Sequence, residues 1–291
     1  MRIGTYNLKF LFDEGIRLHS GKEHTFTADF AEKRFAFFAK QFDVLNADIL
    51  FLQELGDESA LQKILTQTKN SYSYFIAELD KYGVGNAVIY KKDLRCVCSS
   101  VPTNAALPVF SETDKDLLGS RMWSRRNYIK LETMYKNKPL TLFGVHVKSR
   151  FLMYKEGVSF PESPETLTQI DLADAIIRSE MFRLSQAKKI REVADTVFDT
   201  DQASQVVVLG DFNTPESSEM FKLIAGNEKD RHDTLVRILG SETVDHILIS
   251  KSLERHVIDK SVFSDGVAPD SPDSIGSDHA AILIDFEPSH Q

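Results

Sequence analysis

Apolar and polar residues alternate over many short runs of the chain, and this period of two is typical of β-strands. Residues 2–8 open with such an alternation, and residues 48–54 form a short apolar strand that ends in Glu54. Asn7 lies at the C-terminal end of the first strand, where side chains of α/β sheets often meet ligands. Further strands are predicted at residues 72–77, 85–91, 94–101, 126–133, 139–147, 206–209, 243–250, 256–263 and 280–286.

Three stretches between these strands carry apolar residues at helical spacing. The second of them covers residues 58–69. The first is marked by Phe30, Phe37, Phe38, Phe42 and Leu45, and the third by Met181, Leu184, Ala187, Ile190, Ala194 and Val197. Strands and helices mix continuously, without a repeat or a linker, so the pattern predicts an α/β fold and one domain over residues 1–291.

Two segments follow no regular period and are predicted to be loops. Residues 149–166 contain Gly157, Pro161 and Pro164. A loop of this length in a compact domain is more often functional than idle. Residues 264–278 are rich in Pro, Asp, Ser and Gly and lead into the last strand.

The overall charge argues against unspecific attraction to polyanions. The formal net charge is −8 and the sequence pI is about 5.5, so a polyanionic substrate needs a local basic patch or a bound cation. Cys96 and Cys98 are too few for a disulfide framework, and no second pair completes a zinc site. We therefore read them as two reduced thiols on one face of a strand.

The first residues of the chain do not have the pattern of a secretory signal. They lack a long apolar run, and no stretch of the sequence approaches the roughly twenty apolar residues that cross a bilayer. We therefore expect a cytoplasmic protein by default, while a secreted mature form without its signal would have the same sequence. No stable protein partner is implied.

Glu54 is the clearest candidate for a metal ligand. It follows an apolar strand, and burial of an unpaired carboxylate is costly, so it must lie at the exit of the strand. Magnesium is held through few protein oxygens and keeps waters that a substrate phosphate can replace. A salt bridge at the end of the strand would explain the same residue, and this strand alone leaves both interpretations open.

Asp211 and Asn213 follow the buried strand at residues 206–209 and lie two positions apart. A carboxylate and an amide placed in this way can orient a water nucleophile and donate a hydrogen bond to a phosphate oxygen. Asp, Asn and the following Pro215 also suit a plain turn. The run Gly-Asp-Phe-Asn after Val-Val-Val-Leu is more specific than a generic turn, and we favour the chemical interpretation.

Two histidines stand at strand ends. His279 opens the final strand, and its imidazole suits proton transfer near neutral pH. Adjacent strand residues face opposite sides, so Asp245 from another strand is a better partner for His279 than Asp278 is. His146 ends the strand at residues 139–147, where a structural role in the core is the alternative.

Basic residues gather locally despite the acidic total. The groups are Arg121, Arg125, Arg126 and Lys130 around Trp123 and Tyr128, and Lys148 and Arg150 after His146. The planar fork of arginine suits phosphate, and aromatic rings among basic residues suit stacked bases, although a solvated strand edge has the same composition. Arg126 and Lys148 are the preferred phosphate contacts.

These residues fall into six short motifs that resemble those of the endonuclease/exonuclease/phosphatase superfamily. The group contains pancreatic deoxyribonuclease, abasic-site endonucleases, neutral sphingomyelinases and inositol-polyphosphate phosphatases. In chain order the motifs are Thr5–Leu8, Leu52–Glu54, Val145–Ser149, Gly210–Asn213, Val244–Ile247 and Ser277–His279. They extend over nearly the whole chain, and together they are far more specific than any one of them.

The resemblance implies a four-layer α/β sandwich, in which two packed mixed β-sheets are flanked by helices and the active site lies at one end. It also implies hydrolysis of phosphoesters with Mg²⁺ or Mn²⁺. The implied metal ligands are Glu54, Asn7 and, more loosely, Asp278; the implied catalytic residues are Asp211, Asn213, His279, His146, Asp245 and Asn7. Asp211 would orient or deprotonate the attacking water, and Asp245 would hold His279.

The sequence departs from the family pattern at Lys9, where abasic-site nucleases often carry an acid. This departure disfavours that branch and a second metal at this position.

We predict a divalent-metal-dependent phosphodiesterase, and specifically a nuclease for which nucleic acid is the substrate. The alternatives are a phosphatase or phospholipase acting on a lipid head group, an inositol phosphate or a nucleotide, and a binding domain without catalysis. Apolar residues at 151–154 would favour a lipid surface.

Overall fold

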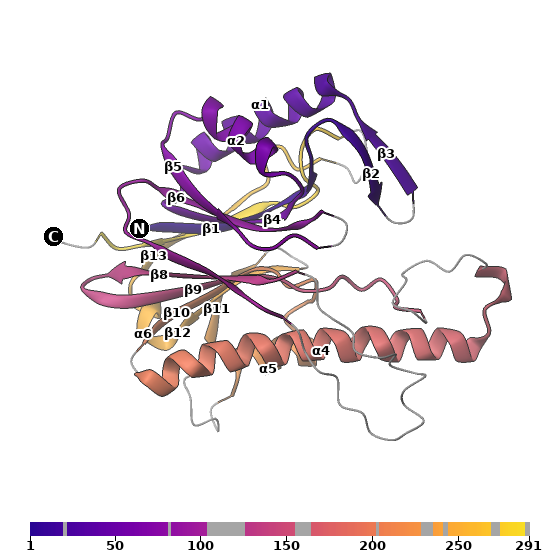
Figure 1. The fold of residues 1–291 in the computed structure, drawn as a ribbon. Coiled ribbons are helices and arrows are strands. Elements are labelled where there is room, and N and C mark those ends of the chain that lie inside the picture. The colour runs from indigo at the N-terminus through magenta and orange to yellow at the C-terminus, as the bar shows by residue number, and fades with distance from the viewer. Residues whose placement is uncertain are drawn as a thin grey trace.

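Two six-stranded sheets lie face to face in the computed structural model, and helices cover the outer face of each (Figure 1). The structure describes residues 1–19, 22–80, 83–103, 126–154, 164–201, 204–227, 235–240, 244–268 and 274–288. The first sheet has the order β13-β14-β1-β4-β6-β5, with β1 at Arg2–Leu11, β4 at Ile49–Leu55, β5 at Tyr72–Ile76, β6 at Gly85–Lys91, β13 at Val257–Phe263 and β14 at Ala281–Phe286. The second has the order β11-β12-β10-β9-β8-β7, with β7 at Val97–Val101, β8 at Tyr128–Tyr135, β9 at Lys138–His146, β10 at Gln205–Asp211, β11 at Leu235–Gly240 and β12 at Asp245–Ser250.

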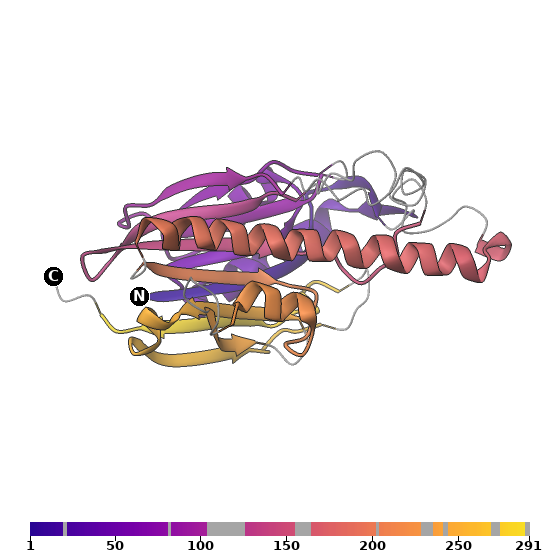
Figure 2. The same ribbon diagram turned by 90° about the horizontal axis from the view of Figure 1, so that it is seen from below.

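Helices form the outer two layers of the sandwich (Figures 1 and 2). The long α4 runs across the second sheet and continues past the ends of its strands (Figure 2). The helices are α1 at Ala28–Leu45 and α2 at Glu58–Gln67 over the first sheet, α4 at Gln169–Thr200 and α5 at Glu219–Ala225 over the second, the short α6 at Lys251–Glu254, and the 3₁₀ turn η2 at Pro164–Thr166. A separate hairpin, β2 at Gly15–His19 and β3 at Lys22–Phe26, stands at the end of the sheets opposite the start of the chain (Figure 1). None of the described helices is both long enough and apolar enough to cross a membrane.

Helix α1 shows how the sequence sets these layers. Thr27 caps its first turn by accepting a hydrogen bond from the N–H of Phe30, and the helix ends where Asn46 takes a left-handed conformation. Between these caps the buried residues recur every three or four positions, so one stripe faces the first sheet. That stripe contains Ala31, Arg34, Phe35, Phe38, Ala39, Phe42 and Leu45.

The central apolar layer lies between the two sheets. Alternating residues of β1 and β4, such as Ile3 and Phe51, meet alternating residues of β9 and β10, such as Leu142 and Val207. Gly144 of β9 lies opposite the ring of Phe51, and its lack of a side chain makes room for that ring. The layer is therefore closely packed at this point.

The structure confirms the predicted four-layer α/β sandwich with two mixed sheets. Most predicted strands lie within a few residues of their observed bounds. The hairpin β2–β3, the edge strand β11 and the short α5 were not predicted, and α4 begins twelve residues earlier than the apolar stripe at 181–197 indicated. The first turns of α4 carry exposed side chains, including Ile170, so no core-facing stripe marks them. The capping box of Thr168 and Asp171 begins the helix instead.

We predict that Gly144→Ala lowers the free energy of unfolding by about 1–3 kcal/mol, because the added methyl group would overlap the Phe51 ring. Denaturant unfolding of the variant measures this loss. Phe51→Ala is the matched partner change, since it removes Cγ, Cδ1 and Cε1, the atoms that the methyl group would meet. The double variant should be more stable than the sum of the two single losses indicates. Strictly additive losses would contradict the proposed contact between the sheets.

Candidate active site

Strand register aligns three of the predicted site residues in one row of the second sheet. Asp211 pairs with His146 on β9 and with Asp245 on β12. The three residues share a face of the sheet with Leu209 and Ile247, which pack against the first sheet. All three are almost fully buried. Their side chains therefore meet at the end of the layer between the sheets.

Glu54 reaches the same place because its backbone departs from strand geometry. By alternation it would share the helix-facing side of Leu52. Its φ of 59° is left-handed, and the pairing of β4 with β6 shifts between Leu52 and Leu55. Its Oε1 lies 3.8 Å from Nε2 of His146, and its Oε2 accepts a hydrogen bond from the N–H of Phe10 at 3.2 Å.

A hydrogen bond between the sheets joins Asn7 to Asp211. Asn7 Nδ2 donates to Asp211 Oδ2 at 3.1 Å, and the N–H of Asn213 donates to Asp211 Oδ1 at 2.8 Å. Burial, and then the negative charge of Asp245, raise the pKa of Asp211 to about 7. The carboxylates at this point of the structure therefore lack sufficient compensating positive charge.

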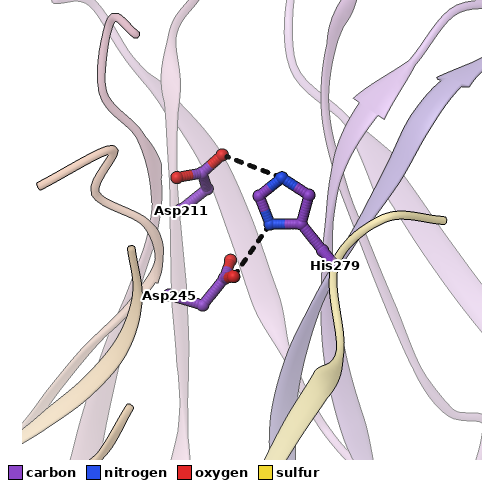
Figure 3. Close-up of side chains that lie close together, drawn as sticks. All are labelled: Asp211, Asp245 and His279. Carbon is purple, nitrogen blue, oxygen red and sulfur yellow. Dashed lines mark hydrogen bonds and ion pairs between the residues drawn. The ribbon is translucent and has the colours of Figure 1, made fainter. Parts of the chain in front are cut away.

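His279 lies on the loop before β14 and faces two of these carboxylates (Figure 3). Its Nδ1 is 2.8 Å from Asp245 Oδ2, and its Nε2 is 4.0 Å from Asp211 Oδ2. Burial opposes a charge on the ring, but the hydrogen bond and charge of Asp245, with those of Asp211 and Asp278, raise the pKa of His279 to about 10. Asp278 itself forms an ion pair with Lys9, with Nζ and Oδ2 3.6 Å apart.

The imidazole of His146 is neutral, in contrast to that of His279. Burial, and then the positive charges of Arg126 and His279, hold its pKa well below the usual value. Arg126 Nη1 lies 2.8 Å from His146 Nε2. A guanidinium can only donate, so this ring nitrogen accepts and the ring is neutral. On its other side, Arg126 Nε lies 3.5 Å from Asp80 Oδ2, which fixes the guanidinium beside the site.

Asn213 and Lys148 are each engaged with backbone carbonyl groups. Asn213 has a left-handed φ of 49°, and its Nδ2 donates to the carbonyl of Val147 at 2.9 Å. The Lys148 ammonium donates to the carbonyls of Ser149 and Phe151. Burial, and then nearby arginine charges, lower the pKa of Lys148 to about 8. Its contacts therefore hold the loop after β9, whereas Arg126 is the predicted phosphate contact that lies beside the carboxylates.

Sequence reasoning missed three charged residues that support this geometry. Asp80 holds Arg126, and Arg183 of α4 donates to the carbonyl of Asn213 at 3.1 Å. Arg34 of α1 donates to three successive carbonyls at the end of β1. For Arg34 the signal was a charged residue within an otherwise apolar helical stripe, whereas the buried stripe of α4 contains several polar residues and does not single out Arg183. Arg121, Trp123 and Arg125 of the predicted basic and aromatic cluster lie outside the described residues.

Two sets of residues in the site have metal-ligand chemistry. Ligand atoms of Asp211, Asp245 and His279 lie within 4.8 Å of one another. Nδ1 of His279 is hydrogen-bonded to Asp245 and the pKa of the ring is raised, so the three are better described as a hydrogen-bonded Asp245–His279 pair with Asp211 at ion-pair distance. Glu54 and Asn7 supply the carboxylate and amide oxygens that magnesium accepts. The pKa of Glu54 is raised by burial despite the charges of Arg126 and His279, so a cation there would relieve an unfavourable charge.

Known proteins share this fold at low sequence identity. No curated protein sequence matches the chain. Among solved structures, the catalytic domain of human nocturnin is 16% identical with a TM-score of 0.58, and the match covers 99% of this chain and 94% of that one. A mannosyl-6-phosphatase from Bacteroides thetaiotaomicron is 15% identical with a TM-score of 0.59, and the match covers 99% of both chains. A humanized TDP2 from D. rerio is 13% identical with a TM-score of 0.58, again over 99% of both chains.

The family model extends from the first strand to the imidazole of the site. The model of the endonuclease/exonuclease/phosphatase family matches residues 4–279, which include all six motifs noted in the sequence. The chain therefore belongs to the endonuclease/exonuclease/phosphatase family.

Proposed function

We propose that this chain is a divalent-metal-dependent phosphodiesterase, and specifically a nuclease that hydrolyses DNA or RNA by in-line attack of water. Its family consists of hydrolases of phosphate esters. The observation that carries the proposal is the meeting of four groups at one end of the sandwich: the carboxylates of Glu54 and Asp211, the protonated His279 and the amide of Asn7. We treat residues 1–291 as one catalytic domain.

Glu54 and Asn7 would hold Mg²⁺ or Mn²⁺, and Asp278 is a further oxygen donor nearby. Such an ion would neutralise charge on the phosphate and on the leaving oxygen. The donor set fits this role because it consists of oxygens only, as magnesium requires. Lys9 already neutralises part of the charge of Asp278, which supports a single metal on the Glu54 side.

Asp211 is the proposed base that orients the attacking water. Both of its oxygens are fixed, one by Asn7 and one by the N–H of Asn213, so the carboxylate cannot rotate freely. Its raised pKa makes it a better proton acceptor than an exposed aspartate. The amide of Asn213 would stabilise negative charge that develops on the phosphate.

His279 is the proposed donor to the phosphate or to the leaving oxygen. It stays protonated at neutral pH because Asp245 supports its charge. His146 is neutral, and because its Nε2 accepts from Arg126 it would hold that guanidinium beside Glu54. Arg126 would bind a non-bridging phosphate oxygen through its planar fork. These local cations would allow an acidic protein to bind a polyanion, with an affinity that falls as salt rises.

One observation favours the second candidate, a phosphatase or phospholipase acting on a lipid head group, an inositol phosphate or a nucleotide. The side chain of Phe151 is 58% exposed on the loop after β9. This loop packs on α4, because the N–H of Met153 donates to the carbonyl of Ala175, and Ile176 beside it is also exposed. Exposed apolar side chains next to a phosphoesterase site suit a lipid surface.

We predict that Asp211→Asn and His279→Ala each lower turnover by at least about a hundredfold, because each removes a proton-transfer group. The measurement is hydrolysis of a panel with magnesium, manganese or a chelator: supercoiled DNA, an abasic duplex, RNA, sphingomyelin, an inositol phosphate and a bis-aryl phosphodiester.

Asp259→Asn on the exposed edge of β13 is the matched control and should leave turnover unchanged. Metal-dependent cleavage of DNA or RNA supports the nuclease proposal. Turnover of the lipid or inositol substrate alone would support the second candidate, a phosphatase or phospholipase that uses the same mechanism. Wild-type rates in both site variants would show that the assignment of the site is wrong.

We also predict that Asp245→Asn lowers the pKa of His279 from its raised value of about 10, because the variant removes the carboxylate that accepts from Nδ1. Titration of the histidine ring signals by NMR in metal-free protein measures this change. The backbone amide signal of His256, which lies beside Glu287 at the far end of the sheets, should be the same in both proteins. An unchanged His279 pKa would contradict the hydrogen bond drawn in Figure 3.

A further inference from the structure

Arg34 is a buried charge on the apolar face of α1. Only 2% of its surface is exposed, and its guanidinium carbon lies 5.5 Å from the centre of the Phe38 ring. Burial lowers the pKa of Arg34 to about 10, which leaves it charged at neutral pH. An arginine in such a place needs strong acceptors to offset the loss of hydration.

The acceptors are carbonyl groups at the end of β1. Arg34 Nη2 donates to the carbonyls of Leu8 at 2.7 Å and Lys9 at 2.8 Å, and Nη1 donates to that of Phe10 at 2.8 Å. Its Nε lies 3.4 Å from the carbonyl of Ile275, three residues before Asp278. One guanidinium thus fastens two separate segments that carry site residues.

The β1 segment has an unfavourable backbone. Lys9 and Phe10 both have φ of 50°, and the pairing of β1 with β4 is interrupted between Asn7 and Leu11. Two successive left-handed residues with side chains are strained, because each Cβ lies too close to the following carbonyl oxygen. The bonds from Arg34 are made to this stretch and stabilise it against a return to extended strand.

This strained stretch supplies the hydrogen bonds that orient two proposed metal ligands. The N–H of Lys9 donates to Asn7 Oδ1 at 2.9 Å, and the N–H of Phe10 donates to Glu54 Oε2 at 3.2 Å. In an extended strand these two N–H groups would point to opposite sides and could not serve both ligands. The left-handed turn is therefore what aims both N–H groups at the site.

We propose that Arg34 is a positioning residue for the metal site: it holds residues 8–10 in the conformation that orients Glu54 and Asn7, and it thereby sets the affinity for the divalent cation. This inference rests on the proposed function, because it concerns the same ligands. A purely structural Arg34 would affect the stability of the fold and leave the metal affinity of the folded protein unchanged.

The test compares Arg34→Lys with Arg191→Lys. Lysine keeps the charge but has no planar fork with which to reach several carbonyls. Arg191 is a matched control, because it is also a buried helical arginine and donates to a carbonyl, that of Ala225, while its ion pair is with Asp195 and not with a carboxylate of the site. Mn²⁺ binding is measured on the folded proteins by the EPR signal of free Mn²⁺, and stability by thermal unfolding.

We expect Arg34→Lys to weaken Mn²⁺ binding by about ten- to a hundredfold, as loss of supporting contacts does at metal sites. Arg191→Lys should bind Mn²⁺ as the wild type does, whatever its stability. Adding Phe10→Gly to Arg34→Lys should recover part of the affinity, because glycine adopts a left-handed φ without strain. A gain in Mn²⁺ affinity from this glycine is expected only if Arg34 acts by holding the backbone of residues 8–10.

Folded Arg34→Lys with wild-type Mn²⁺ affinity would overturn the inference. A wild-type protein that binds no Mn²⁺ would instead overturn the proposed function on which the inference rests.

If Arg34→Lys does not fold, a second variant, Phe38→Leu, tests the inference, since it removes the ring beside the guanidinium and keeps Arg34. It should weaken Mn²⁺ binding, whereas Phe42→Leu, one turn along the same buried face, should not. Equal Mn²⁺ affinities in these two variants would also overturn the inference.

Discussion

The face-to-face packing of the two sheets is the constraint on which the rest of the structure depends. The carboxylates of the site come from both sheets, with Glu54 on β4 and Asp211 and Asp245 at the ends of β10 and β12. They meet because the apolar layer between the sheets fixes the distance and angle of the strands that carry them. Gly144 against Phe51 is one point at which this fit is close.

Charge at the end of that layer is what gives the structure its chemistry. Buried carboxylates repel each other, and the protein offsets this in part with the cations of His279, Arg126, Lys9 and Arg34. The compensation is incomplete, because burial and Asp245 still raise the pKa of Asp211 to about 7. A divalent cation beside Glu54 and Asn7 would complete it, and the same imbalance makes Asp211 a proton acceptor.

Much of this arrangement could be predicted from the sequence, because it follows from strand alternation. The period of two places adjacent residues of a strand on opposite sides, so Asp278 could be set aside as the partner of His279. The same rule favoured Asp245 as the partner of His279, and these side chains lie 2.8 Å apart. The family resemblance then supplied the order of the layers, which alternation alone does not contain.

The features that sequence reasoning missed depend on departures from regular geometry. Glu54 enters the site through a left-handed φ, although its place in the strand puts it on the helix side. The role of Arg34 depends on carbonyls that converge only because Lys9 and Phe10 are left-handed. Glycine is the usual sequence signal for a left-handed φ, and none of these left-handed positions is a glycine. The ammonium of Lys148 holds a loop that has no periodic pattern, so its partners could not be derived.

The most direct test of the central claim is the position of the bound metal. Crystals grown with Mn²⁺ would show its site by anomalous scattering, independently of any substrate. We predict an anomalous peak within coordination distance of Glu54 and Asn7, and no peak there in Glu54→Gln. A peak held by Asp245 and His279 in its place would contradict the account, because these two would then be ligands and not the proton-transfer pair.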